Sequence, residues 1–332
     1  MMILRSLRRG SRRAALALAL AALALGACTN SKLIVGPLYN RLDDRVRAQF
    51  EELGDFDERQ TALFDAAVGT AHVWHRRSEL PAYARLLGEI AASVAEPGRT
   101  TVDDVTRWAR TVEAHAIAAR ECHPVNFSTG IMRTLTDAQV DGIERHLAEE
   151  RAEYRERHAS RTPEERVARR LRNLRKWAGR IGLDFTAEQN ALLRGTLEGQ
   201  TSLRREYRAL SDRWNEELFR LARDRTAPDF DARMRAHLAD FWTLLEREHP
   251  EPWRRNRELW RDAAYRFVAS MTPEQREVTS AWLAKMGETL AAVARDEPSF
   301  DVGDDPSVGC LVGPATGTGA AGGAGDGEDA TG

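Results

Sequence analysis

Cysteine and lysine are scarce in this 332-residue chain, which contains three of each. The cysteines, at positions 28, 122 and 310, do not have the C-x-x-C spacing typical of zinc sites, so the common cysteine-based metal centres are excluded. A disulfide between Cys122 and Cys310 stays open, because an oxidising compartment would permit it. Arginine supplies nearly all of the positive charge.

Long apolar runs and strand patterns are also missing. The longest apolar run, residues 14–25, has 12 residues, whereas a helix that crosses a bilayer needs roughly 20. No segment alternates β-branched and polar residues as a half-buried strand does. The chain also has no Gly-rich phosphate loop, no H-E-x-x-H motif and no G-x-S-x-G motif. We therefore expect no cofactor, no metal and no catalytic residue.

The amino-terminal residues 1–27 have the pattern of a bacterial lipoprotein signal peptide. Five arginines precede the apolar run, and Leu-Gly-Ala-Cys follows it at residues 25–28. This sequence resembles a lipobox, which implies that the signal is cleaved, that Cys28 is lipidated and that residues 28–32 tether the protein to a membrane. Several acyl chains hold a protein firmly, whereas one binds only marginally. The alternative is an ordinary secretory signal with a chance cysteine.

The residue after the lipobox bears on localisation. Thr29 stands where an aspartate would favour retention in the inner membrane. In a Gram-negative cell, the lipoprotein sorting pattern therefore implies an outer-membrane lipoprotein that faces the periplasm.

The other end of the chain, residues 297–332, is predicted to be a disordered acidic tail. It is rich in glycine and alanine and contains seven acidic and no basic residues, so it cannot bury enough apolar surface to offset the entropy of ordering. Without this tail and residues 1–28, the chain keeps 44 basic and 44 acidic side chains. Nucleic-acid binders usually have a basic excess, so we expect no nucleic-acid partner.

Residues 33–296 are predicted to form an all-α domain of antiparallel hairpins or a bundle. Apolar residues at 203, 207, 210, 214, 218 and 221 form one narrow helical stripe. Five capping boxes mark helix starts, because Thr or Asp caps the first N–H groups while Gln or Glu three residues later reaches back. The pairs are Asp57 and Gln60, Thr136 and Gln139, Thr162 and Glu165, Thr186 and Gln189, and Thr272 and Gln275.

These starts give a map of the expected helices. The ranges are about 33–53, 58–95 with a kink or break at Pro81, 102–121, 137–160, 163–181, 187–224, 229–247, 253–269 and 273–295. The glutamines of the boxes are 79, 50 and 86 residues apart. These unequal intervals exclude a regular solenoid, but the similar first and last intervals allow two similar halves divided near residue 182.

Charged residues provide one candidate binding surface. Residues 161–180 hold eight basic and two acidic side chains. They are interpreted either as the exposed back of a helix or as a patch for anionic lipid headgroups or an acidic partner. The patch would consist of Arg166, Arg169, Arg170, Arg172, Arg175 and Lys176.

Aromatic and titratable residues provide two further alternatives. The eight tryptophans are predicted to pack in the core, and the alternative is an aromatic groove for a client protein or peptide. An enzyme would place its site around His72, His75 and Glu79, close to Trp74. We expect binding rather than catalysis, because these residues match no familiar catalytic set.

Four stretches resemble domain-of-unknown-function family 6279, an uncharacterised group of proteobacterial lipoproteins. They are LYNRLDD (38–44), DFDERQTALF (55–64), WHRRSELPAYARLL (74–87) and SMTPEQREVTSAWLAKM (270–286). The resemblance extends to about residue 296, although Asp57 stands where the family more often has Thr. It implies an all-helical, lipid-anchored envelope protein and assigns no catalytic residue. The Thr-x-x-Gln phrase alone is similar to repeats in helical periplasmic proteins, some of which are stress-induced chaperones.

Together these patterns predict a lipid-anchored protein of the cell envelope that is not an enzyme. We expect it to bind a protein partner or client as an interaction or chaperone-like module. The alternative is a structural tether or an assembly subunit of an envelope complex.

Overall fold

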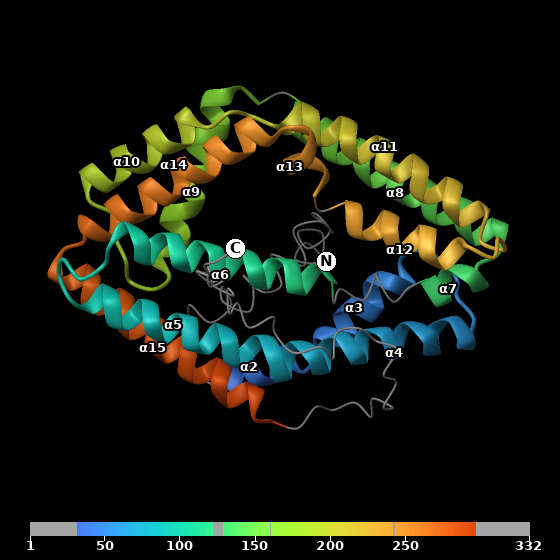
Figure 1. Cartoon of the computed structure of the whole chain (residues 1–332), viewed down its shortest axis with the longest axis horizontal. Coiled ribbons are helices and arrows are strands. Elements are labelled where there is room, and N and C mark those ends of the chain that lie inside the picture. Colours follow the sequence, from blue (N-terminus) through green and yellow to red (C-terminus); the bar gives the residue numbers. More distant parts are fainter. Residues whose placement is uncertain (1–31, 122–128, 160, 242, 297–332) are drawn as a thin grey trace, which may run out of the picture.

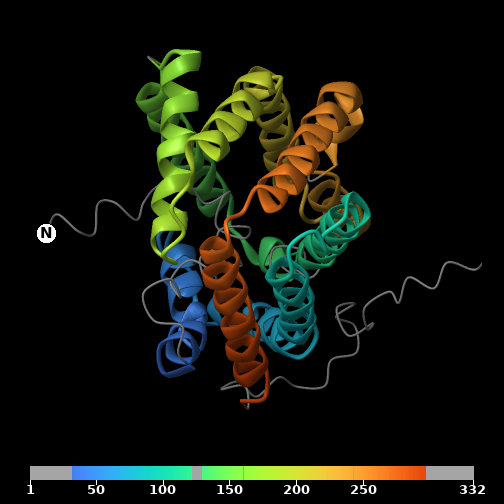
Figure 2. The ribbon, with the colours of Figure 1, turned by 90° about the vertical axis from the view of Figure 1, so that its left-hand side faces the viewer.

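The helices of this protein trace an elongated ring (Figure 1). The structure is a computed structural model that describes residues 32–121, 129–159, 161–241 and 243–296. The predicted signal peptide, Cys28, Cys122, Cys310 and the acidic tail lie outside these residues. Viewed from the side, α14 and α15 lie end to end along one wall of the ring (Figure 2).

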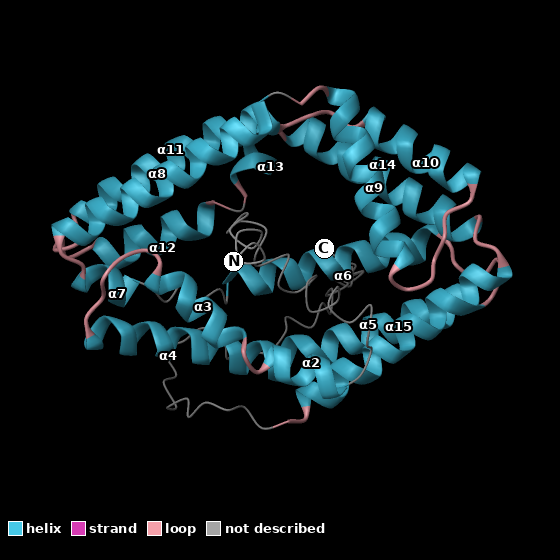
Figure 3. Ribbon diagram, turned by 180° about the vertical axis from the view of Figure 1, so that it is seen from behind, coloured by secondary structure: helices cyan, strands magenta, loops and turns pink. Residues whose placement is uncertain are grey.

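All regular elements of the described residues are helices (Figure 3), which confirms the all-α prediction. In chain order they are α2 (Lys32–Tyr39), α3 (Leu42–Glu51), α4 (Glu58–Trp74), the π-helix η2 (His75–Glu79), α5 (Leu80–Ala95), α6 (Val102–Glu121), α7 (Thr129–Thr134), α8 (Asp137–Ala159), α9 (Pro163–Gly179), α10 (Ala187–Gly199), α11 (Arg204–Arg223), α12 (Phe230–Asp240), α13 (Leu244–Glu248), α14 (Pro250–Ala269) and α15 (Pro273–Ala294). None of these helices is long and apolar enough to cross a membrane.

Three helices that the sequence predicts as continuous are divided, and α7 was not predicted. The expected helix 33–53 is α2 and α3, 187–224 is α10 and α11, and 229–247 is α12 and α13. The second break shows the reason: Asn256 of α14 accepts from the Thr201 N–H and donates to the Thr201 carbonyl, both at 2.9 Å. Such tertiary contacts satisfy backbone groups outside a helix, and apolar periodicity cannot reveal them.

The five predicted capping boxes stand at helix starts. In each, the backbone N–H at the third helical residue donates to the cap oxygen at 2.8–3.2 Å. The side chain of that third residue accepts from the cap N–H at 2.9–3.0 Å. A sixth box, Thr101 with Asp104, starts α6. The boxes satisfy backbone donors that the helix itself leaves unpaired.

Four of these boxes meet in pairs through their glutamines. Gln60 donates to Gln139 at 3.1 Å and accepts from it at 2.9 Å, an arrangement that we call the Gln60–Gln139 clasp. Gln189 and Gln275 exchange hydrogen bonds of 2.8 and 2.9 Å, the Gln189–Gln275 clasp. The starts of α4 and α8 meet at one end of the ring, and those of α10 and α15 meet at the other (Figure 1). Each clasp therefore joins two helix starts at its own end of the ring.

Among the residues that the structure describes, three apolar clusters lie along the ring. One gathers buried residues of α3, α7, α8, α11 and α12, a second joins α2, α5 and α15, and a third joins α9, α10 and α14. Helices α5 and α15 approach closely, because a Cβ atom at Gly287 would lie 3.0 Å from the Ala84 carbonyl oxygen. Helices from both sides of residue 182 thus pack against each other.

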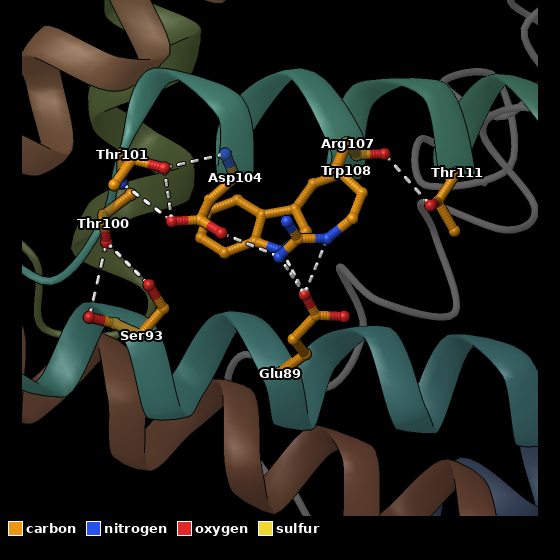
Figure 4. A network of polar contacts seen from close by, with 8 residues as sticks. All are labelled: Glu89, Ser93, Thr100, Thr101, Asp104, Arg107, Trp108 and Thr111. Atoms are coloured by element: carbon orange, nitrogen blue, oxygen red, sulfur yellow. Dashed lines mark hydrogen bonds and ion pairs between the residues drawn. The ribbon is translucent and has the colours of Figure 1, made fainter.

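Helix α6 is fixed to α5 by polar contacts at their turn (Figure 4). The Glu89 carboxylate accepts from Trp108 Nε1 at 3.1 Å and from Arg107 Nε at 3.2 Å. The Ser93 and Thr100 hydroxyls lie 3.0 Å apart within the same turn. Because Trp108 is buried, these contacts fix the direction in which α6 leaves α5.

Candidate functional site at the π-helix

The candidate site is built on η2, the π-helix between α4 and α5. Pro81 follows η2 in the first turn of α5. The kink predicted at Pro81 is thus the widened turn of η2. Proline has no N–H and its ring crowds the carbonyl four residues earlier, so one wider turn accommodates it. π-Helical turns occur frequently at functional sites. Here the turn places Arg76 and Glu79 in the interior, at 1 % and 2 % exposure.

Arg76 joins three parts of the chain. Its Nη1 donates to the carbonyls of Val293 at 3.0 Å and Asp296 at 3.2 Å, at the end of α15. Its Nη2 donates to Asn40 Oδ1, just after α2. The guanidinium carbon lies 4.9 Å from the centre of the Tyr39 ring. A cation at the carboxyl end of a helix is favourable, so Arg76 locks the first and last described helices to η2.

Two aromatic residues line the cluster on the side of α2. The Tyr39 hydroxyl lies 2.9 Å from His75 Nδ1, and its ring meets His72 edge-on with centroids 4.6 Å apart. Tyr83 of α5 lies edge-on to His75 at 5.8 Å. The Tyr39 ring therefore covers the charged group of Arg76, which is almost completely buried.

The acidic member of the cluster is Glu79. Its Oε2 lies 3.0 Å from His115 Nδ1 of α6, and Tyr83 packs edge-on against His115 at 5.1 Å. This contact ties α6 to η2, so the site gathers side chains from α2, η2, α5 and α6.

Burial sets the protonation of the cluster. It lowers the pKa of His72 to about 4, and the positive charge of Arg76 adds to the shift. It also lowers the pKa of His75 to about 4, although the Glu79 carboxylate opposes the change. Burial raises the pKa of Tyr39 and of Tyr83 well above the usual range. At neutral pH both of these histidines are neutral and both phenols keep their protons.

The arrangement suits a structural lock better than a reacting centre. Arg76 is committed to two backbone carbonyls and to Asn40, and Tyr39 pairs with His75 as Glu79 does with His115, although Arg76 Nε has no hydrogen-bond partner among the described residues. Of the residues that an enzyme hypothesis singles out, the structure brings His72, His75 and Glu79 into one cluster. The sequence reasoning missed Tyr39, Arg76 and His115. Arg76 lies inside the quoted WHRRSELP stretch, so an arginine just before a helix-breaking proline was an available signal.

The predicted basic patch is divided between different environments. Arg170 Nη1 donates to Gln200 Oε1 at 2.9 Å, and Arg175 Nε donates to Asn190 Oδ1 at 2.6 Å. Arg172 and Lys176 are exposed on the outer side of α9, and Arg166 and Arg169 are half-buried. Arg170 and Arg175 are exposed as well, and a binding role for the six residues stays a prediction.

The tryptophans and metal candidates give a mixed result. Trp74 and Trp108 are buried and Trp177 is exposed, whereas Trp214, Trp253, Trp260 and Trp282 are half-buried. Trp242 lies outside the described residues. In the part of the chain that the structure describes, no group of three or more His, Cys, Asp or Glu side chains is arranged to hold a metal ion.

Comparison with known families places the protein. Residues 52–249 match the model of a Family of unknown function, DUF6279. The chain belongs to this family. The match includes η2, Glu79 and His115 but ends before α15, and two of the four quoted stretches, 55–64 and 74–87, lie inside it. The sequence therefore predicted the family DUF6279 correctly. The matched range, residues 52–249, is shorter than the resemblance to about residue 296 that was expected. No curated protein and no solved structure matches the chain.

Proposed function

We propose that this DUF6279 protein is a lipid-anchored protein of the cell envelope that faces the periplasm and binds apolar segments of a protein client. In this proposal it acts through a helical surface rather than as an enzyme. The anchor is Cys28, and the client surface is the stretch of α6 that exposes Val112 and Ile117.

The exposure of α6 is the observation that carries the proposal. The side chains of Val112 and Ile117 are 55 % and 44 % exposed. Neighbouring groups hold the helix in place: the Glu89 contacts at its start, the Glu79–His115 contact and an ion pair of Glu113 with Arg257 of α14. A helix fixed on several sides that still presents apolar side chains suits a contact surface. An unfolded client would supply apolar side chains of its own.

Client binding is tested by the suppression of aggregation. Reduced, unfolded lysozyme is the probe, and light scattering is measured with and without the protein. Val112→Lys and Ile117→Lys should each weaken the suppression several-fold. Ala114→Lys, at an exposed position of the same helix, should change it less than twofold. Equal effects of all three changes, or no suppression by the unmodified protein, would contradict the proposal.

The anchor is tested separately by Cys28→Ser. This change should release the protein from the membrane fraction and abolish labelling with radioactive palmitate. If the variant stays membrane-bound and labelled, the anchor is wrong, and the result for α6 still stands on its own.

A structural tether is the second candidate, and the Arg76 lock favours it. Arg76 fixes the end of α2, the first described helix, to the last turn of α15, so a pull on the amino-terminal side would be carried by the whole ring. A photo-crosslinking residue at position 112 separates the two functions in cells. A single partner in constant proportion indicates a tether or an assembly subunit, whereas many unfolded proteins indicate clients.

A further inference from the structure

Helix α2, the first described helix, is fastened to the rest of the ring through η2. The Tyr39 hydroxyl lies 2.9 Å from His75 Nδ1, and Asn40 Oδ1 accepts from Arg76 Nη2. Apolar packing adds to these bonds, because Val35 and Tyr39 of α2 belong to the buried cluster shared with α5 and α15. The position of α2 therefore depends on a few side chains of η2.

Two histidines border this attachment. His72 is 8 % exposed, and its ring meets the Tyr39 ring edge-on with centroids 4.6 Å apart. His75 stacks against the same ring at a centroid distance of 5.8 Å. The guanidinium carbon of Arg76 lies 4.9 Å from the centre of the Tyr39 ring. One tyrosine ring of α2 thus lies among two imidazoles and a permanent cation.

A proton on either imidazole would change the forces on α2. Imidazole is the side chain that ordinarily changes its charge between about pH 5 and pH 8, whereas a guanidinium group stays charged. A protonated His72 or His75 would place a second positive charge close to Arg76, which is 1 % exposed. Like charges repel strongly where little water screens them. Protonation is therefore favoured only if the groups separate or water enters.

The carboxylate of η2 gives limited relief from this repulsion. Glu79 attracts a positive charge on His75. Its oxygens are already engaged, because Oε2 lies 3.0 Å from His115 Nδ1 of α6 and the carboxylate also bonds the Tyr83 hydroxyl of α5. One carboxylate therefore faces several groups that compete for it.

The groups on the other side of the histidines give no relief. At His72, the charges of Arg76 and His75 both oppose a proton. Tyr39 of α2 keeps its own proton, because burial raises its pKa. The carbonyls at the end of α15 are bound to Arg76. A charged His72 thus finds repulsion from η2 and no compensating anion from α2.

The docked and undocked forms of α2 differ in how readily they take up protons. Burial lowers the pKa of both histidines to about 4 in the docked form, and water around an uncovered ring would return it toward the ordinary 6.5. Below about pH 6.5 the undocked form then binds more protons, so a falling pH favours undocking. We propose that η2 is an acid-released latch, in which protons on His72 and His75 repel Arg76 and free α2 from η2 and from the end of α15.

The latch acts on the segment that leads toward the membrane. Helix α2 begins at Lys32 and has eight residues, and the predicted tether is residues 28–32. Undocking would add α2 to that tether and let the ring stand further from the membrane. This consequence rests on the proposed anchor at Cys28, whereas the latch itself does not.

Hydrogen–deuterium exchange of the full chain at pH 7 and pH 5 tests the latch, with each rate corrected for the intrinsic effect of pH. A pKa of about 4 when docked against 6.5 when undocked makes undocking up to about twentyfold more favourable at pH 5 for each histidine. The protection of the α2 amides should therefore fall by up to about 400-fold for the two together. Unchanged protection of α2 would overturn the latch.

Helix α10 is the internal reference for this experiment. It lies on the upper side of the ring, whereas α2 lies on the lower side (Figure 1). Because undocking leaves the other helices folded, the α10 amides should stay more protected than those of α2 at both pH values. Equal protection of the two helices at pH 5 would mean that the whole molecule opens, which also overturns the latch.

Two variants assign the effect to the histidines. His72→Phe keeps a ring against Tyr39, His75→Gln keeps a side chain that can bond the Tyr39 hydroxyl, and neither replacement takes up a proton in this range. Each should remove about twentyfold of the fall in protection, and the double variant should remove nearly all of it. The matched control is His146→Phe, at a half-buried histidine of α8, which should leave the response of α2 unchanged.

A response of α2 that survives in the double variant, or that His146→Phe also removes, would contradict the latch. Circular dichroism at pH 7 shows whether each variant is folded. If His75→Gln unfolds the protein, His72→Phe alone must still remove its own share of the response.

Discussion

The two clasps repeat one hydrogen-bond pattern at opposite ends of the ring. In each clasp, a glutamine caps its own helix with Oε1 and uses Nε2 for its partner. The Nε2 group also donates to the carbonyl two residues before the partner's cap. The acceptors are Thr134, Asp55, Ser270 and Asp184. The same local rule therefore produces the same junction on both sides of residue 182.

The clasps differ in how deeply they are buried. Gln189 and Gln275 are 0 % and 8 % exposed, and Gln60 is 1 % exposed, but Gln139 is only half-buried. Water can replace the hydrogen bonds of Gln139, whereas it cannot reach those of Gln189. The comparison shows that a shared motif does not imply a shared contribution to stability, because the cost of losing a hydrogen bond depends on burial.

The supporting arginines also differ. At the Gln60–Gln139 clasp, Arg225 of the loop after α11 donates to the Leu135 carbonyl at 2.6 Å. At the other clasp, Arg276 follows Gln275 directly and donates to the Val94 carbonyl at 3.0 Å and the Val268 carbonyl at 2.7 Å. Arg276, beside the second clasp, thus connects the end of α5 and the end of α14 to α15, so disturbing this junction should loosen more of the ring.

Gln189→Ala should have the largest effect on the free energy of unfolding. It removes the helix cap and both buried hydrogen bonds that Gln189 exchanges with Gln275, which keeps only its bonds to Asp184 and Thr272. We therefore expect a loss of about 2–4 kcal/mol. Urea unfolding followed by circular dichroism measures it. The exposed neighbour Glu188→Ala is the control and should cost less than about 1 kcal/mol. A loss no larger than that of the control would show that the clasp does not hold this end.

Acid should weaken the fold through the π-helix site while affecting neither clasp. His72 and His75 bind a proton near pH 4 when folded, against the ordinary 6.5. Between these values the unfolded chain binds more protons. The free energy of unfolding should therefore fall as the pH is lowered from about 6.5 to about 4, by at most about 1.4 kcal/mol per pH unit for each histidine.

Two variants check the origin of this pH dependence. His72→Phe keeps the ring contact with Tyr39 and should flatten the curve. The Gln189→Ala curve should run parallel to that of the unmodified protein, since an amide does not titrate. A Gln189→Ala curve with a changed slope would mean that the clasp and the π-helix site are coupled.

Gln139→Ala should cost less than Gln189→Ala, about 1–2 kcal/mol, because solvent can reach the site. Gln139→Glu distinguishes the cap from the clasp, since a carboxylate keeps the acceptor but cannot donate to Gln60. Equal urea midpoints for Gln139→Glu and the unmodified protein would show that the cap alone matters at this end.

Glu165→Ala should have the smallest effect, about 0.5–1 kcal/mol. Glu165 completes an exposed capping box that has no partner glutamine, so its removal measures the cap without a clasp. The thermal unfolding midpoint is a sufficient readout. A cost as large as that of Gln189→Ala would remove the distinction between the two kinds of box.

The helix starts could be predicted because a capping box is a local structure of four residues. The sequence also held an unused signal for the clasps. A glutamine side chain has both a donor and an acceptor, whereas ionised glutamate only accepts. Gln60, Gln139, Gln189 and Gln275 form clasps, and Glu165 does not. Which glutamines meet could not be predicted, because it depends on helices that pack 79 and 86 residues apart in the chain.

The candidate site was less predictable than the fold. His75 and Glu79 stand in a quoted motif, but Tyr39 and His115 reach them from elements 36 residues away in each direction. Arg76 and Arg77 are neighbours of the same type, yet the first is buried and the second is exposed. The widened turn before Pro81 decides between them, and Pro81 indicates a break there without indicating which arginine turns inward.

The Arg76 lock also gives the ring an unusual topology. One guanidinium contacts Asn40 and Val293, so the first and the last helix of the described residues lie within the reach of a single side chain. The described helices therefore form a closed ring, and the ring should tolerate chain ends at another loop. A circular permutant that joins residue 296 to residue 32 through a short linker, and opens in the loop after Ala95, should keep every helix in place.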